Sequence, residues 1–182
     1  MATIVLIGAS GSGKSIIEHE LSERGFRKIV SYTTRQPREG EKNGKDYWFV
    51  SNDTFKDMLA EGLFAEYEEY SQGRFYGTLK SDYVEGNNVA VLTPNGIRQV
   101  KRNLPNSDIY SVLVNADLGT RMLRYINRIG VDKFTYDDKN ELCSRADRDF
   151  GAFLGSNKEV NLIVDNNYGT DIKDIVSDII NA

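Results

Sequence analysis

The segment "ATIVLIGASGSGKS" near the start of the chain restricts the fold more than any other stretch. Its first half, residues 2–8, is a continuous run of apolar and β-branched residues, which is typical of a strand buried on both faces of a parallel sheet. Its second half, residues 8–15, matches the pattern G-x-x-x-x-G-K-[ST], and apolar residues at helical spacing follow it. A strand, a glycine-rich turn and a helix in this order predict a phosphate-binding loop.

Each residue type in this loop suits a nucleoside triphosphate. Glycines let successive backbone N–H groups point at phosphate oxygens, and the amino end of the following helix adds partial positive charge. Lys14 would reach the β- and γ-phosphates, and the Ser15 hydroxyl would join the shell of a Mg²⁺ ion bound with the nucleotide. The predicted ATP-binding residues are Gly8, Ala9, Ser10, Gly11, Ser12, Gly13, Lys14 and Ser15. The loop alone does not distinguish a small-molecule kinase from a GTPase or a motor.

Further β-branched runs alternate with helical patterns along the chain, which predicts a parallel α/β sheet. We expect strands at residues 2–8, 26–32, 88–93, 107–116 and 159–166. The predicted architecture is a three-layer P-loop kinase fold with a five-stranded parallel core sheet.

Two stretches interrupt the alternation and are predicted to be lobes inserted into this core. Residues 32–82 combine a helix capped by Asn52 or Asp53 with a hairpin that turns at Gln72-Gly73, so we expect a small mixed sheet there. Residues 124–145 are expected to form a helical lid whose middle, residues 130–141, has the composition of a mobile loop. The core would then consist of residues 1–31, 83–123 and 146–182.

Composition excludes several classes of function. The chain has 182 residues and a formal net charge of −4, without the basic excess of a general nucleic-acid binder. No apolar run approaches the ~20 residues of a membrane span, and no basic region precedes the first strand, so we expect a cytoplasmic monomer or homodimer. Cys143, the only cysteine, is expected to be a half-buried thiol on a helix, and a catalytic triad or metal site built on the single His19 is disfavoured.

The segment "SYTTRQPREGEKNGKDYWFV" at residues 31–50 has the residue types of a dianion receptor. Arg35 and Arg38 supply two guanidinium forks, which bind phosphate oxygens in bidentate fashion. Ser31 and Tyr47 add hydroxyl groups, and the glycines at 40 and 44 allow the chain to turn back on itself. Composition alone favours the alternative, a solvated charged loop with surface ion pairs.

The segment "EYEEYSQGRFYGT" adds residues that suit the recognition of a base. A buried carboxylate at Glu66 would accept from N1–H and the 2-amino group of guanine and would reject adenine, which offers no such pair. Thr78 and Tyr76 follow on the second half of the hairpin. A solvent-facing role for Glu66 is the alternative, and Glu68 and Glu69 are close competitors for the same function.

Together, "GASGSGKS", "SYTTRQPREGEKNGKDYWFV" and "EYEEYSQGRFYGT" resemble the guanylate kinase family over most of the chain. The resemblance implies ATP on the phosphate loop, GMP or dGMP in the lobe at 32–82, Mg²⁺ as cofactor and transfer of the γ-phosphate to GMP. It implies no nucleic-acid or membrane partner. The GMP-binding residues would be Ser31, Arg35, Arg38, Tyr47, Glu66, Tyr76 and Thr78.

The lid region fits the same family. "RYINR" places Arg124 and Arg128 on one face of a helix, and "NELCSRADRD" adds Arg145 and Arg148. Exposed arginines paired with Asp or Glu are a good alternative for Arg121 and Arg148 and a weaker one for the others. By resemblance, the catalytic cations would be Lys14, Arg35, Arg124, Arg128 and Arg145.

The sequence also departs from the family pattern. Thr93, Pro94 and Asn95 stand where the family has acidic residues after the third strand, and Ile16 replaces a second hydroxyl in the phosphate loop. Preference for GMP or dGMP therefore stays open. Two rival functions remain: another small-molecule kinase such as a ribose-bisphosphate kinase, and a non-catalytic guanylate-kinase-like module that binds a phosphopeptide. The former would lose the base-reading residues, and the latter typically loses the phosphate loop and the lid arginines.

Overall fold

The computed structural model describes residues 2–71, 73–84, 86–153 and 155–182. Gln72, part of the predicted hairpin turn, lies outside the described residues. The core is a five-stranded sheet in the order β2-β7-β1-β8-β9, and every pairing in it is parallel. Its strands are β1 (Thr3–Ile7), β2 (Arg27–Lys28), β7 (Asn88–Val91), β8 (Ile109–Asn115) and β9 (Leu162–Asp165). The predicted core sheet is confirmed.

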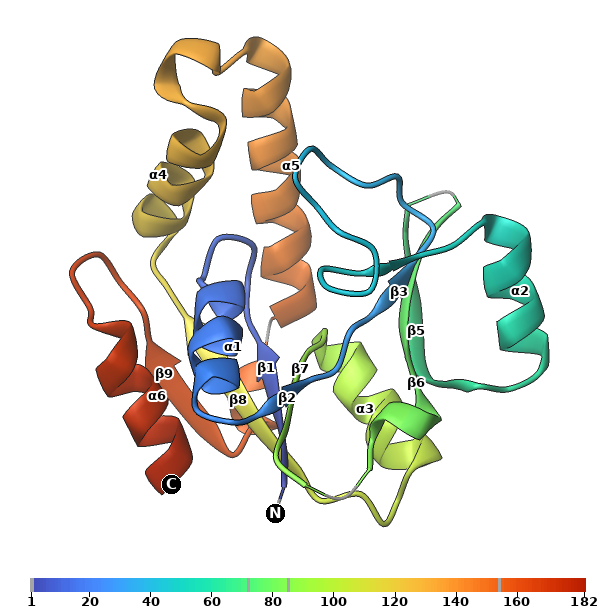
Figure 1. The fold of residues 1–182 in the computed structure, drawn as a ribbon. Coiled ribbons are helices and arrows are strands. Elements are labelled where there is room, and N and C mark those ends of the chain that lie inside the picture. The colour runs from blue at the N-terminus through green and yellow to red at the C-terminus, as the bar shows by residue number, and fades with distance from the viewer. Residues whose placement is uncertain (1, 72, 85, 154) are drawn as a thin grey trace.

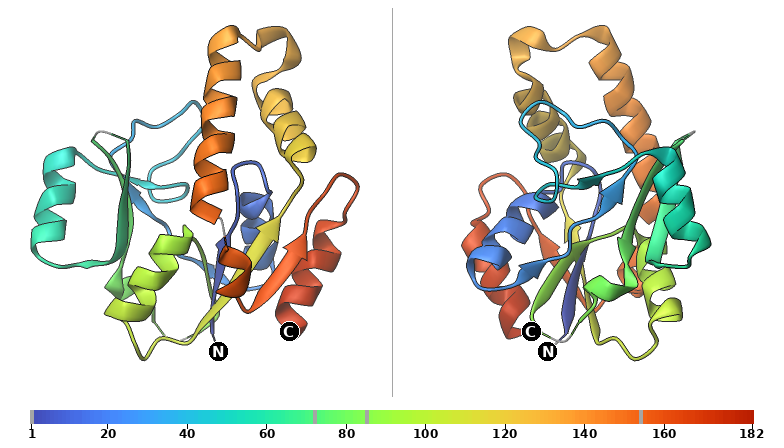
Figure 2. Two further views of the ribbon diagram at one scale, coloured as in Figure 1. Left: turned by 180° about the vertical axis from the view of Figure 1, so that it is seen from behind. Right: turned by 45° about the vertical axis from the view of Figure 1, so that its right-hand side comes forward.

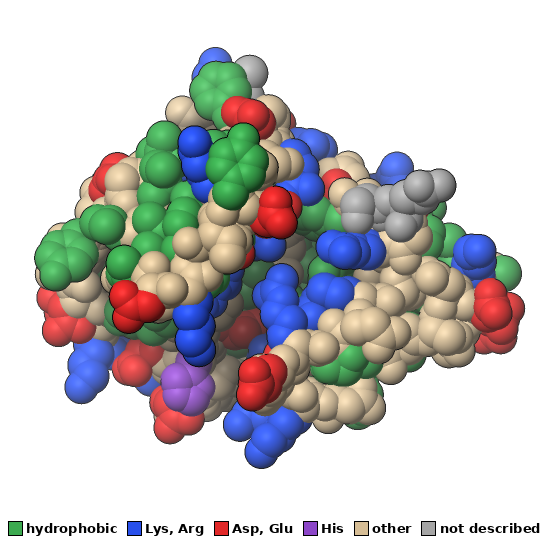
Figure 3. All heavy atoms as spheres, turned by 90° about the horizontal axis from the view of Figure 1, so that it is seen from above, with side chains coloured by type: hydrophobic (Ala, Val, Ile, Leu, Met, Phe, Trp, Pro, Cys, Tyr) green, Lys and Arg blue, Asp and Glu red, His purple; other side chains and the backbone are tan. Residues whose placement is uncertain are grey.

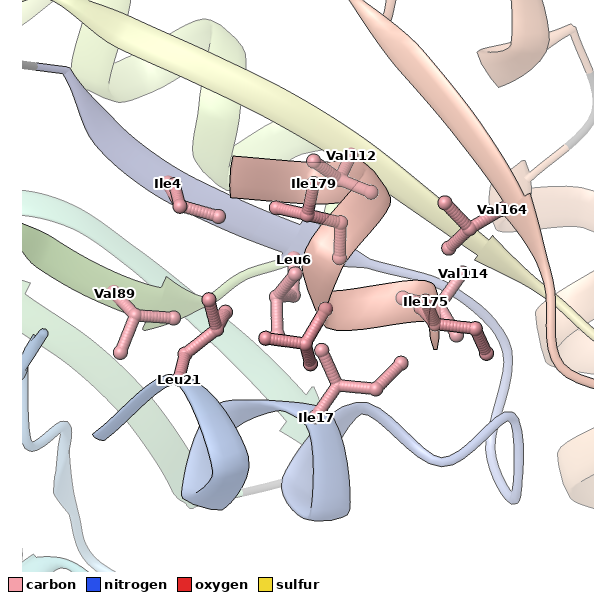
Figure 4. Packing of buried hydrophobic residues seen from close by; sticks show 11 residues of the cluster. Ile4, Leu6, Ile17, Leu21, Val89, Val112, Val114, Val164, Ile175 and Ile179 are labelled. Carbon is pink, nitrogen blue, oxygen red and sulfur yellow. The ribbon is translucent and has the colours of Figure 1, made fainter. Parts of the chain in front are cut away.

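Helices cover both faces of the core sheet and give the chain its three layers (Figures 1 and 2). One face is covered by α1 (Lys14–Glu23) and α6 (Ile172–Asn181), whose apolar side chains interdigitate with those of β1 and β8 (Figure 4). Ile17 and Leu21 of α1 are completely buried there. Burial of such side chains, worth about 1.5–3 kcal/mol each, fixes α1 and hence the loop before it against the sheet.

The opposite face is covered by α3 (Pro94–Asn103) and by the end of α5 (Tyr136–Phe153). Ile97 and Val100 of α3 pack with Val5 and Ile7 of β1. Successive side chains of β1 point into the two apolar layers in turn, which accounts for its uninterrupted apolar run. This confirms the prediction of a strand buried on both faces of the sheet.

A second, four-stranded mixed sheet carries the inserted lobe, in the order β4-β3-β6-β5. Its strands are β3 (Tyr32–Thr33), β4 (Trp48–Phe49), β5 (Phe64–Ser71) and β6 (Arg74–Leu79). β3 pairs parallel with β4, and the other pairings are antiparallel, so the predicted mixed sheet and hairpin are present.

The single strand predicted at residues 26–32 is wrong in detail, because the chain passes from one sheet to the other there. The Ile29 N–H still donates to the Val89 oxygen of the core sheet at 2.8 Å. The Ser31 oxygen already accepts from the Trp48 N–H of the lobe at 2.9 Å. The segment is therefore split into β2 and β3, since its backbone groups find partners in two different sheets.

The cap of α2 (Asn52–Ala60) also differs from the prediction. Ser51 is the capping residue, and its hydroxyl accepts from the Thr54 N–H at 3.0 Å. Asn52 and Asp53, the predicted caps, lie inside the first turn of the helix. Phe55 from this helix is completely buried and stacks on Phe64 of β5 with ring centroids 4.4 Å apart.

The lid contains more helix than its composition predicted. It consists of α4 (Leu118–Ile129), a short 3-10 turn η2 (Val131–Lys133) and the first half of α5, which rise above the sheet in Figure 1. The predicted mobile loop is wrong for residues 136–141, which are helical. A reciprocal cap starts this helix: the Asp138 carboxylate accepts from the Thr135 N–H at 2.9 Å, and the Thr135 hydroxyl accepts from the Asp138 N–H at 3.3 Å. Cys143 lies on α5 and is exposed, where the sequence analysis expected half burial.

Candidate active site

The carboxyl ends of the core strands meet at one edge of the sheet, where ligands of open α/β folds bind. Seen from above, Lys and Arg side chains gather around a hollow on this side of the molecule (Figure 3). A first cavity of about 330 Å³ lies between the phosphate loop, the inserted lobe and α5. A second cavity of about 560 Å³ lies between the start of α1, α4 and α5. Lys14 and Arg145 line both cavities, so the two are neighbours.

The phosphate loop depends on glycine at two close approaches. Gly8 and Gly13 both have positive φ, at 153° and 96°. A Cβ on Gly8 would collide with the Val114 oxygen, and one on Gly13 would collide with the Asn166 side chain. Any other residue at these positions would be strained and would push the loop off the sheet. Helix α1 begins at Lys14, and its N-cap Gly13 offers no side-chain cap to the amino end of the helix.

Lys14 lies under this loop. Its Nζ donates to the Gly8 and Ala9 oxygens at 2.6 and 3.0 Å. Burial, which disfavours the ammonium form, lowers the pKa of Lys14 to about 8, against the attraction of Asp149. The ammonium is thus held where negative charge of a ligand would compensate its burial.

Arg124 braces the loop from α4. Its Nη1 donates to the Gly11 and Ser12 oxygens, and its Nη2 donates to Asn166 Oδ1, each at 3.2 Å. Asn166, just after β9, also donates to the Ser12 oxygen at 2.8 Å. Arg124 therefore satisfies loop carbonyls as well as lining the second cavity.

A carboxylate from α5 occupies the open side of the same loop. Asp149 Oδ2 accepts from the Ser10 N–H at 2.8 Å and from Arg121 Nη1 at 3.2 Å. Both side chains of this ion pair are largely buried, at 16% and 18% exposed. Pairing with an acid was the alternative for Arg121, and it is confirmed, although the pair lies inside the site instead of on the surface.

Arg35 of the inserted lobe is already paired with a carboxylate. Its Nη1 and Nη2 donate to the two oxygens of Glu41 at 2.9 Å each, and its guanidinium lies 5.2 Å from the centre of the Tyr47 ring. The Arg38 backbone N–H also donates to Glu41, at 2.7 Å. The hydrogen bonds from Arg35 lower the pKa of Glu41. The Arg35 guanidinium therefore uses its bidentate geometry on the Glu41 carboxylate, and its binding of a phosphate stays a prediction.

Aromatic hydroxyls surround this fork. Tyr47 and Tyr76 meet edge to face with centroids 5.9 Å apart, and both line the first cavity together with Ser31 and Arg38. Burial raises the pKa of Tyr47 by disfavouring the phenolate, and the neutral hydroxyl can donate a hydrogen bond. Among the ion pairs of the described residues, none uses the Arg38 guanidinium.

Glu66 is buried at the floor of the first cavity, only 6% exposed. Its Oε1 accepts from the Thr78 hydroxyl at 2.9 Å, and Thr78 in turn contacts the Tyr83 hydroxyl at 2.9 Å. Burial raises the pKa of Glu66 to about 7, against the hydrogen bonds from Thr78. Its competitor Glu69 is exposed and accepts from the Gly73 N–H at 2.8 Å, outside the cavity.

The lid arginines converge on Tyr125. The guanidinium groups of Arg128 and Arg145 lie 5.2 and 5.3 Å from its ring centre. Burial is the main cause that lowers the pKa of Arg128, and the neighbouring cations Arg145 and Arg38 lower it further. Arg145 is also paired with Glu141, Nε to Oε1 at 2.8 Å, although pairing was considered a weaker alternative for it. Arg148 lies 3.6 Å from the same carboxylate.

The structure gathers most, but not all, of the predicted site residues. Of the predicted set, the first cavity is lined by Gly8, Ser10, Lys14, Ser31, Arg35, Arg38, Tyr47, Glu66, Tyr76 and Arg145. The second is lined by Ser10, Gly11, Gly13, Lys14, Ser15, Arg124, Arg128 and Arg145. Ala9, Ser12 and Thr78 line neither, and Ser12 is completely buried.

The altered turn after β7 has a structural explanation. The Thr93 hydroxyl accepts from the Gly96 N–H at 2.9 Å and caps α3, which begins at Pro94. Thr93 lines the first cavity, whereas Asn95 is exposed.

Sequence reasoning missed Glu41, Asp149 and Asn166. Glu41 lies in the segment already singled out, and Asp149 is four residues after Arg145, hence on the same helix face. These spacings were available signals. The contacts of Asn166 with a loop far away in sequence had none.

A phosphate loop at the end of β1, faced by an inserted lobe and a lid that both carry arginines, defines a P-loop α/β protein with two adjoining cavities lined by cations. The family model described as guanylate kinase matches residues 1–181. The chain therefore belongs to the guanylate kinase family.

Individual relatives of the chain are also guanylate kinases. The chain is 40% identical to a guanylate kinase from Lactobacillus delbrueckii subsp. bulgaricus over 64% of this chain and 60% of that protein. It is 33% identical to one from Enterococcus faecalis over 96% of this chain and 87% of that protein. The chain spans about three fifths of the length of the first curated relatives it matches, at 60% and 64%.

Solved structures share the fold. A guanylate kinase from Anaplasma phagocytophilum superposes with a TM-score of 0.66 at 23% identity, over 99% of this chain and 82% of that chain. A gluconokinase from Sinorhizobium meliloti 1021 superposes with a TM-score of 0.52 at 15% identity, over 99% and 90%. The described residues contain no helix long and apolar enough to cross a membrane.

Proposed function

We propose that the chain transfers the γ-phosphate of Mg·ATP to GMP, giving ADP and GDP. The observation that carries this proposal is one cavity whose walls combine Lys14 of the phosphate loop, Arg38 and Tyr47 of the inserted lobe, and the buried carboxylate of Glu66. Phosphoryl transfer needs two anions held together and their charge neutralised, with little covalent help from the protein. A cavity lined by cations that could neutralise the phosphates, and by a buried carboxylate that could read a base, supports the proposal.

On the donor side, ATP would lie on the loop at residues 8–15. Lys14 would exchange its bonds to loop carbonyls for the β- and γ-phosphates, and Arg124, Arg128 and Arg145 would neutralise the triphosphate from the lid. Asp149 accepts from the Ser10 N–H at 2.8 Å, so a phosphate that uses this N–H must displace its carboxylate.

On the acceptor side, Arg35, Arg38, Ser31, Tyr47 and Tyr76 would hold the GMP phosphate. Glu66, kept in place by Thr78, would accept from N1–H and the 2-amino group of guanine. The phosphate of a nucleoside monophosphate is largely a dianion at neutral pH, with a second pKa of about 6. It can therefore attack without a general base.

Magnesium would be held mainly by the nucleotide. In the described part of the chain no group of three or more His, Cys, Asp or Glu side chains is placed to hold a metal. Mg²⁺ commonly keeps several waters and takes substrate phosphates with one or two protein ligands. The exposed Ser15 hydroxyl at the start of α1 fits that role. The ion would supply charge neutralisation between the phosphates.

The proposal also includes a closing motion of the two inserted units and the cellular setting of the protein. The units 32–82 and 124–145 would close over the core (1–31, 83–123 and 146–182) and exclude water, since an open site would hydrolyse ATP. We further propose a cytoplasmic monomer or homodimer that uses GMP or dGMP and binds neither nucleic acid nor membrane.

A coupled ADP-release assay with Mg·ATP and a panel of nucleoside monophosphates tests the proposal. We expect turnover with GMP or dGMP and little with AMP, CMP or UMP, because only guanine offers Glu66 two parallel donors. Preferred turnover of a different acceptor would indicate another small-molecule kinase. If none of the acceptors is phosphorylated, the non-catalytic binding module becomes the better function.

A further inference from the structure

A further carboxylate faces the first cavity and is used by none of the roles above. Glu68 lines this cavity from β5, and its Oε2 atom is buried. Within the described residues this oxygen accepts no hydrogen bond, and Glu68 takes part in none of their ion pairs. A buried carboxylate oxygen without a donor is costly, so a ligand that brings a donor to it gains affinity.

The pairing of β5 with β6 places Glu68 between the residues proposed to bind the base of the acceptor nucleotide and those proposed to bind its phosphate. Side chains at alternate positions of a strand share a face, so Glu66 and Glu68 both point into the cavity. Glu66 is paired across the hairpin with Thr78, and Glu68 is paired with Tyr76. Glu68 therefore lies two residues along β5 from Glu66, on the side of Tyr76, which is proposed to bind the phosphate.

The chemistry of GMP leaves few groups that suit this carboxylate. The phosphate is excluded, because two anions repel each other. The N1–H and one 2-amino hydrogen of guanine are directed to Glu66. The hydroxyls of the ribose are donors that lie between base and phosphate, which is the place that Glu68 faces.

We propose that Glu68 accepts hydrogen bonds from the ribose hydroxyls of the acceptor nucleotide and sets a preference for ribose over sugars that lack them. The proposal rests on the proposed function, since it takes GMP as the acceptor. It concerns binding, so it is tested without turnover.

Isothermal titration calorimetry would compare GMP with 2′,3′-dideoxyguanosine monophosphate on the intact chain. Hydrogen bonds to a charged group typically change affinity by about 10- to 100-fold, so we expect GMP to bind that much more tightly than the dideoxy form. Glu68→Ala should reduce this ratio at least about tenfold, and the isosteric Glu68→Gln should reduce it partly. Glu69→Gln, the same change one residue along on the opposite face, should leave the ratio unchanged.

The ratio separates a sugar contact from a general charge effect. Removing a negative charge from the cavity favours every phosphate-bearing ligand equally and cancels in the ratio. A ratio that stays at the wild-type value in both Glu68 variants, or an equal loss for both ligands, overturns the proposal. Failure of wild-type protein to phosphorylate GMP in the ADP-release assay would instead count against the proposed function, while the calorimetric ratio still decides the role of Glu68.

Discussion

The elevated pKa of Glu66 makes a specific prediction about pH. Burial raises this pKa to about 7, so the carboxylate form is populated above pH 7 and lost as the pH falls below it. Guanine recognition needs the ionised form, which accepts two N–H donors; the protonated acid loses one of these acceptors. The kcat/KM for GMP should therefore rise with pH through about 7.

The size of the effect follows from the ionised fraction. With a pKa of about 7, roughly nine-tenths of Glu66 is ionised at pH 8 and roughly one-tenth at pH 6, a change of about tenfold. The GMP phosphate adds about twofold, because its second pKa is about 6. Lys14, with a pKa of about 8, is about half protonated at pH 8, which offsets the gain from the phosphate by about twofold and limits the useful range to pH 6–8.

The assay is ADP release at saturating Mg·ATP and low GMP, which reports kcat/KM and hence ionisations of the enzyme before GMP binds. Glu66→Gln provides the control. It keeps the shape and an acceptor for Thr78 but cannot ionise, so its kcat/KM should be lower and should change by no more than about twofold across the same range. Equal pH slopes in the wild type and Glu66→Gln would refute a base-reading role for the Glu66 carboxylate.

Three further outcomes are expected. Lys14→Ala should lower kcat at least about 100-fold while the circular dichroism spectrum stays unchanged, because it removes a partly buried cation from the phosphates. Lys101→Ala, which changes an exposed lysine on α3, serves as the control and should retain full activity. Arg35→Lys should raise the KM for GMP about tenfold with little change for ATP, since an ammonium cannot replace a bidentate fork; equal effects on both substrates would contradict this. The free energy of unfolding of Glu66→Gln, measured in urea, should rise relative to that of the wild type by about 2 kcal/mol between pH 5 and pH 8. The raised pKa of Glu66 means that its ionisation is penalised in the folded state, and Gln cannot ionise. A difference between the two proteins that does not change with pH would argue against that penalty.

The core could be predicted from local patterns because its determinants are local. An uninterrupted apolar run, as at residues 2–8, is the direct consequence of a strand covered on both faces, and the turn at residues 8–15 carries its spacing within a single short segment. The five-stranded parallel sheet followed from repeating this pattern along the chain. The inserted lobes were predicted because they break this pattern.

The candidate site was predictable only in part. Arg35 and Glu66 are recognisable by residue type within compact motifs. Which acid faces which cation was not, since Glu41 and Asp149 reach their partners through a folded loop and a helix docked on the sheet. The division of residues 26–32 between two sheets was equally hidden, because each half is extended and no local feature marks the crossing.

The sequence by itself determined the phosphate loop, the alternation of strands and helices, and the inventory of cations. Tertiary structure decided which of these groups share a cavity. Strand register placed Glu66 and Glu68 on the inner face and Glu69 outside, and helix docking brought Asp149 onto the Ser10 N–H. The physical reason is that residue periodicity is a short-range property, whereas register, burial and the pKa values that depend on them are fixed only when distant segments pack together.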